Sequence, residues 1–113
     1  MIKIILFYDS KNLIAFKING HAPDYICAGV SVLALNTINC IEKFTHDKFF
    51  CDYDKNGGMI DFKFLDHKIS HDACLLIKAL ELGLRDVYKT YKNFIKIQEV
   101  NKNVWYEFKF FCS

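Results

Sequence analysis

The chain has 113 residues, of which 52% are hydrophobic and 25% charged, with one proline and a formal net charge of +2. This length suits a single domain spanning residues 1–113, and the composition excludes a disordered chain. So small a net charge does not by itself indicate a nucleic-acid-binding protein. The apolar run at residues 2–7 is too short for a signal peptide, and we expect no membrane-spanning segment.

The five cysteines contain no CxxC or CxC pair. An odd number of cysteines without paired spacing, in a chain with no predicted secretory leader, is typical of free thiols in a reducing compartment. The sequence therefore predicts a cytoplasmic protein with unpaired cysteines.

The N-terminal segments predict a β-hairpin. Residues 2–8 form an apolar run, and Ile14, Phe16 and Ile18 alternate with the remaining residues of the run 12–18. Alternation with a period of two places these three side chains on one buried face of a strand. Residues 8–12 are rich in turn formers, and Gly20 ends the second strand.

Residues 25–45 predict an amphipathic helix. Its apolar stripe recurs every three or four residues and comprises Val30, Ala34, Thr37, Ile38, Ile41 and Phe44. Asp24 directly precedes this segment and is the expected N-cap. Cys27 falls on the same stripe, so we expect its thiol to point toward the protein interior.

The rest of the chain predicts a second hairpin, a second helix and two more strands. Residues 47–54 and 59–65 alternate on either side of Asn56-Gly57, a strong hairpin signal. Residues 70–91 show helical spacing behind the capping residue Ser70. Residues 93–100 and 104–111 read as neighbouring strands. The order β-β-α-β-β-α-β-β predicts an α+β two-layer sandwich, with a mostly antiparallel sheet and two helices on one face.

The joint between the second strand and the first helix carries the candidate chemistry. A thiol in the first turn of a helix lies in the positive field of unpaired N–H groups, which favours its thiolate form. His21 lies close enough in sequence to Cys27 to accept its proton. The backbone around Gly20, Ala28 and Gly29 is the candidate oxyanion region. Asp24 would either orient His21 or cap the helix.

Each of these residues also has a common structural explanation. A cysteine at a helix start is usually a small buried side chain, and an aspartate there is usually a cap. His67, His71 and Cys74 resemble a metal cluster in spacing but lack a fourth ligand, so no metal or cofactor is predicted. Lysines and aromatic residues mix over residues 88–96, where a solvated helix end is favoured over direct RNA contact.

Several motifs together resemble those of the ribosomal-processing cysteine protease Prp family. They are Gly20-His21-Ala22, then Asp24-Tyr25-Ile26-Cys27-Ala28-Gly29, then Asn56-Gly57-Gly58 and the segment 75–84. The resemblance implies a small cytoplasmic endopeptidase that removes the N-terminal extension of the twenty-seventh large-subunit ribosomal protein, cutting after an aromatic pair. It also implies a homodimer. By match of motif, Cys27 is the nucleophile, His21 the general base, and Asp24 the family's acidic position.

One departure from the family pattern supports a second hypothesis. The family usually has a longer, glycine-containing loop between Gly-His-Ala and the acidic residue, whereas here Pro23 follows Ala22 directly. Tyr25 also stands where the family commonly has an aliphatic residue. The alternative to an active protease is therefore a catalytically impaired relative that binds ribosomal protein or RNA.

Overall fold

The computed structural model describes residues 1–101, 111 and 112, which fold around one hydrophobic core. Its elements are β1 (Ile2–Asp9), β2 (Asn12–Gly20), α1 (Asp24–Phe44), β3 (Phe49–Tyr53), β4 (Met59–Phe64), β5 (Lys68–Ile69), α2 (His71–Thr90), β6 (Ile95–Asn101) and β7 (Phe111–Cys112). The predicted hairpins and both helices are present within a few residues of their expected limits.

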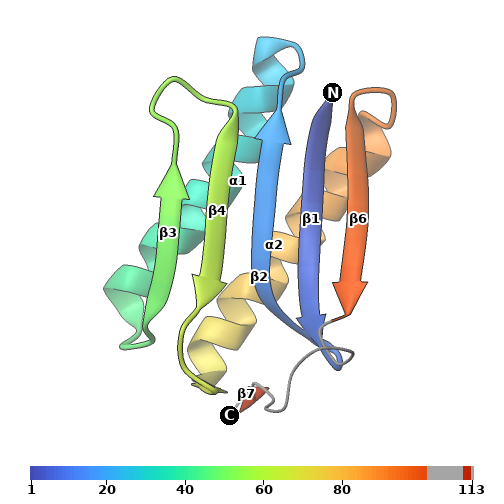
Figure 1. The fold of residues 1–113 in the computed structure, drawn as a ribbon. Helices are drawn as coiled ribbons and strands as arrows, with labels where there is room; N and C mark the ends of the chain where they lie inside the picture. Colours follow the sequence, from blue (N-terminus) through green and yellow to red (C-terminus); the bar gives the residue numbers. More distant parts are fainter. Residues whose placement is uncertain (102–110, 113) are drawn as a thin grey trace.

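Five of the strands form one sheet in the order β3-β4-β2-β1-β6. The pairs β3–β4, β4–β2 and β2–β1 are antiparallel, and β1–β6 is parallel. Both helices cover the same face of this sheet (Figure 1). The predicted α+β fold with a mostly antiparallel sheet and two helices on one face is therefore confirmed.

The C-terminal part differs from the prediction. The strand expected at residues 104–111 falls mostly on residues 102–110, which lie outside the described residues. Phe111, its last residue, pairs with Lys68 in a small parallel sheet of β5 and β7. The expected pairing beside residues 93–100 is thus wrong for Phe111, and β5 itself was not predicted.

The core lies between the inner face of the sheet and the two helices. Side chains of a strand alternate between its faces, and Ile4, Leu6, Phe16 and Phe62 all point inward, where they are completely buried. The rings of Phe16 and Phe62 stack across the neighbouring strands β2 and β4, with centroids 5.2 Å apart. The alternating apolar residues that predicted strand 12–18 are therefore buried in the core.

Helix α1 is a core helix. Its buried side chains are spaced by three or four residues, as the apolar stripe predicted: Ile26, Val30, Ala34, Thr37, Ile38 and Ile41. With 21 residues it is nonetheless long and apolar enough to cross a membrane by length and composition. That test is also passed by core helices, and one face of α1 packs on the sheet, as expected of a core helix.

The cysteines are not all free. Cys27, Cys40 and Cys51 are free and partly buried. Cys74 lies on α2, where it is buried and disulfide-bonded. The prediction of unpaired cysteines is therefore wrong for Cys74, because disulfide pairing depends on three-dimensional neighbours that cysteine spacing does not reveal.

A polar contact joins the segment after α1 to the start of α2. Ser70 occupies the N-cap of α2, and its hydroxyl oxygen accepts a hydrogen bond from Ala73 N at 3.1 Å. The same hydroxyl donates to Asp47 Oδ1 at 2.5 Å, and Ser70 N donates to Asp47 Oδ2 at 2.8 Å. Partial burial raises the pKa of Asp47, but these hydrogen bonds outweigh it and hold the pKa below its usual value.

We predict that Ser70→Ala destabilises the protein by about 1 kcal/mol at neutral pH, because the helix loses its cap. Stability falls further because Asp47 loses the hydrogen bond from the Ser70 hydroxyl. A carboxyl group whose pKa is lower in the folded protein stabilises the fold at pH values above its pKa in the unfolded chain, about 3.9. This contribution to the free energy of unfolding is lost as the pH falls through the pKa of the folded protein. Urea unfolding at pH 7 and at low pH should show the difference shrinking. Ser70→Thr keeps the hydroxyl and is the control, and a difference independent of pH would contradict the role of Asp47.

Candidate active site

The joint between β2 and α1 is short and fixed. Three residues, 21–23, connect Gly20 to the first residue of α1. Gly20 has a φ of +102°, which favours glycine. A Cβ at Gly20 would lie 2.1 Å from the carbonyl oxygen of Met1. Only a residue without a side chain allows the joint to approach the start of β1 this closely.

Helix α1 begins one residue earlier than expected. Pro23 occupies the N-cap position, and no side chain caps the helix. Its carbonyl oxygen accepts hydrogen bonds from Ile26 N at 2.9 Å and Cys27 N at 3.2 Å. Asp24 is the exposed first residue of α1, so the expectation of an Asp24 N-cap was wrong in position. Its carboxylate still suits the positive end of the helix dipole.

Cys27 lies in the first turn of α1 and is half-buried, packed against the core. Its Sγ lies 3.3 Å from both polar backbone atoms of Ala22: the N–H donates to the sulfur, and the thiol donates to the carbonyl oxygen. The predicted inward direction of the thiol is therefore confirmed. The sulfur is oriented by the chain segment that carries His21.

His21 is exposed, and its ring lies against the turn between β3 and β4. A Cβ at Gly58 would lie 2.9 Å from Cε1 and 3.1 Å from Nε2 of this ring. The carbonyl oxygen of His21 accepts a hydrogen bond from Met1 N at 2.6 Å. Within the described residues, the ring is hydrogen-bonded neither to Cys27 nor to Asp24. The structure thus brings the imidazole and the thiol to one joint but leaves them without a direct hydrogen bond.

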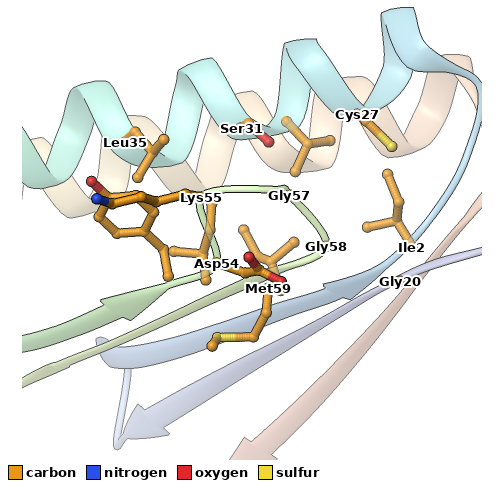
Figure 2. Close-up of a pocket in the computed structure, with 14 residues that line it drawn as sticks. Ile2, Gly20, Cys27, Ser31, Leu35, Asp54, Lys55, Gly57, Gly58 and Met59 are labelled. Atoms are coloured by element: carbon orange, nitrogen blue, oxygen red, sulfur yellow. The ribbon is translucent and has the colours of Figure 1, made fainter.

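A cavity of about 190 Å³ separates α1 from the β3–β4 turn. Figure 2 shows Cys27, Ser31 and Leu35 along α1 on one side of it, with the turn residues Gly57 and Gly58 opposite. Most of the remaining wall is apolar, from Ile2, Ile18, Val30, Met59 and Ile60. The cavity therefore offers an apolar surface that begins at the candidate nucleophile.

The β3–β4 turn is the part of the site that sequence reasoning missed. Residues 56–58 were interpreted only as a hairpin turn and as part of the family motif. Gly58 has a φ of +95°, which favours glycine, and a glycine beside a strand can also mark a close backbone contact. The contact is with the ring of His21, which is 37 positions earlier in the sequence.

Of the sequence candidates, Gly20 and Cys27 line this cavity, whereas His21 and Asp24 are not among its lining residues. Ala28 and Gly29 are exposed on α1. His71 forms only an exposed pair with Asp72, at 3.6 Å, and the described residues contain no cluster of three or more His, Cys, Asp or Glu able to hold a metal. Tyr25, which is 63% exposed, meets Tyr91 edge-to-face with ring centroids 5.7 Å apart.

The geometry suits nucleophilic chemistry at a thiol. A half-buried thiol at the positive end of a helix, an imidazole on the adjoining loop and an apolar cavity beside the sulfur are the parts that thiol-dependent acyl transfer requires. Catalytic hydrogen bonds are often long in free enzymes and tighten only when substrate binds.

Comparisons with known proteins identify a consistent set of relatives. The sequence model of the family described as "Cysteine protease Prp" matches residues 1–96. The ribosomal processing cysteine protease Prp of Bacillus subtilis is 26% identical over 96 residues, which cover 77% of this chain and 86% of that protein. Its Staphylococcus aureus counterpart is 26% identical over 85 residues, covering 70% of this chain and 79% of that protein.

Solved structures agree with these sequence relatives. The crystal structure of the S. aureus ribosomal processing protease Prp, in complex with a covalently linked product peptide, matches with a TM-score of 0.79 at 25% identity, covering 88% of this chain and 99% of that chain. The Streptococcus mutans protein SMU.848 shares the fold, with a TM-score of 0.79 at 21% identity, covering 90% and 96% of the two chains.

We predict that Gly20→Ala destabilises the protein by roughly 2 kcal/mol or more, because the backbone at the joint must move and a non-glycine residue is strained at positive φ. Gly29→Ala is the matched comparison. Its Cβ would meet nothing within 4 Å, and helix propensity favours alanine by about 1 kcal/mol. Thermal or urea unfolding measures both. Equal effects of the two substitutions would contradict the close packing described at Gly20.

Proposed function

Because the chain belongs to the cysteine protease Prp family and is therefore a cysteine protease, a hydrolase, we propose that Cys27 is its nucleophile and His21 its general base. The observation that carries this assignment is the position of the Cys27 sulfur. It lies in the first turn of α1, at the end of an apolar cavity, and is held by the backbone next to His21.

The reaction then follows ordinary thiol-protease chemistry. His21 takes the proton of the Cys27 thiol, and the sulfur attacks the carbonyl carbon of the scissile peptide bond to form a tetrahedral intermediate. The C–N bond breaks as His21 returns the proton to the leaving amine. Water, deprotonated by His21, attacks the resulting thioester and releases the second product as a carboxylic acid, while His21 returns the proton from water to the Cys27 thiolate. The acid then ionises and its proton passes to the released amine. The thiol is regenerated, so atoms and charges balance.

The oxyanion is best served by N–H groups at the very start of α1. In an α-helix, the N–H groups of Ala28 and Gly29 point to the carbonyl groups four residues earlier. The N–H groups of the first turn have no such partners, and those of Ile26 and Cys27 already donate to Pro23 O. We therefore place the candidate donors at Asp24 and Tyr25 instead of the predicted Ala28 and Gly29, which are exposed on α1.

The proposed substrate is the N-terminal extension of the twenty-seventh large-subunit ribosomal protein. Relatives of this chain are named ribosomal processing proteases, and one has been crystallised with a substrate peptide. The apolar wall beside Cys27 suits the aromatic pair that the family resemblance implies at the cleavage site. By the same resemblance, the protein acts in the cytoplasm as a homodimer, which sedimentation of the purified protein would test.

We predict that the wild-type protein cleaves a synthetic peptide containing this extension after its aromatic pair. Cys27→Ser and His21→Ala should each lower kcat/KM on the order of a thousandfold or more, as expected when the nucleophile or its base is removed. Cys40→Ser, on the same helix but outside the cavity, should leave it unchanged. Mass spectrometry of the products measures both the rate and the cleavage site.

The outcome also separates the active protease from the impaired binding relative. Fluorescence anisotropy measures binding of the peptide. If the wild-type protein binds the peptide but does not cleave it, the result favours a protein that only binds its target. Equal cleavage by wild type and Cys27→Ser would overturn the assignment of the nucleophile.

A further inference from the structure

The β3–β4 turn contacts His21 more closely than any side chain would permit. A Cβ built on Gly58 would lie 2.9 Å from Cε1 and 3.1 Å from Nε2 of the His21 ring. We propose that Gly58 is a positioning residue, whose bare backbone is the wall against which the His21 ring rests. This inference rests on the proposed function, because it concerns where the general base stands.

The turn is fixed relative to the joint by backbone hydrogen bonds. Gly20 N donates to Gly58 O at 3.0 Å, one step beyond the β2–β4 pair of Asn19 and Met59. The turn is closed by Asp54, whose N donates to Met59 O at 3.1 Å and whose O accepts from Gly57 N at 2.9 Å. These hydrogen bonds therefore hold Gly58 at a fixed position relative to the end of β2, which is directly followed by His21.

Contact with the turn is the restraint on the ring that the structure shows. The His21 side chain is exposed and makes no hydrogen bond to any described residue, so its orientation is set by what it touches. The contact at Gly58 limits how far the imidazole can move toward the β3–β4 turn, which lies across the cavity from Cys27 on α1 (Figure 2). A residue with a side chain at this position would push the ring from that place.

Gly57 offers a comparison within the same turn. Both glycines have positive φ, +87° at Gly57 and +95° at Gly58. An alanine at either position carries the same kind of backbone strain. A Cβ at Gly57, however, would meet nothing within 4 Å, whereas the one at Gly58 meets the ring. Both glycines line the cavity, so an effect on peptide binding is common to the two alanine variants, and the His21 ring signal reports the displacement that only Gly58→Ala causes.

The displacement has a definite size. An ordinary Cβ contact begins at 3.4 Å, so a ring 2.9 Å away must retreat by roughly half an ångström or more. The ring is the end of an exposed side chain and can move at little cost in stability. Misplacement of a catalytic group by about 1 Å can lower the rate a hundredfold, so we expect Gly58→Ala to lower kcat about tenfold or more relative to Gly57→Ala.

The experiment compares wild type, Gly57→Ala, Gly58→Ala and His21→Ala in three measurements. The first is peptide cleavage, with kcat and KM separated. The second is the rate at which iodoacetamide alkylates Cys27, followed by mass spectrometry with Cys51 as the internal reference. Burial and nearby carboxylates raise the pKa of the Cys51 thiol, so it reacts slowly. The third is the ¹H–¹³C NMR spectrum of the histidine rings, in which His21→Ala identifies the His21 signal.

Gly58→Ala should shift the His21 ring signal, lower kcat more than it raises KM, and slow alkylation of Cys27, while Gly57→Ala leaves the ring signal in place. Both variants should melt at similar temperatures. An unshifted ring signal in Gly58→Ala, or equal effects of the two variants on kcat, would overturn the proposal. If wild type cleaves nothing, the proposed function fails, and the ring signal still decides whether Gly58 positions His21.

Discussion

The site depends on the central position of β2, which is hydrogen-bonded along both edges. β1 pairs with it on one side, where Ile2 is opposite Gly20, and β4 on the other, where Met59 is opposite Asn19. A strand held on both edges cannot shift register without turning its buried face to solvent. The end of β2 therefore has a fixed place, and with it the point where His21 leaves the sheet. The start of β1 and the β3–β4 turn meet at that same point: Met1 N donates to the backbone carbonyl oxygen of His21, and the turn lies against the His21 ring at Gly58.

Sequence patterns predicted the helices and strands whose buried faces can be recognised from neighbouring residues alone. The alternation of Ile14, Phe16 and Ile18 and the helical stripe containing Val30 and Ile41 record which face of each element is buried, and burial is the main source of its stability. The position of Asp24 was wrong by one residue because Pro23, with its fixed φ, can itself stand at the start of a helix. A pattern of apolar residues does not resolve helix ends to that accuracy.

The missing information was pairing between distant segments. Gly58 lies beside His21 because β4 pairs with β2 in a particular register. That register cannot be predicted from the sequence of either segment alone. The disulfide at Cys74 and the small β5–β7 sheet escaped prediction for the same reason. The candidate nucleophile and base were found because they are close in sequence as well as in space. The opposite wall of the cavity comes from residues 53–60, and it was not found.

The shortness of the joint constrains how the site can be completed. Only residues 21–23 separate β2 from α1, and both ends are fixed, Gly20 by its pairing and the helix start by the hydrogen bonds to Pro23. A segment of three residues held at both ends has little conformational freedom. On the proposed assignment, contact between His21 and the Cys27 thiol comes from rotation of the exposed His21 side chain, a motion faster than loop closure. The proposed role of Gly58 follows from the same reasoning, because the ring's rotation is limited by the backbone that it touches.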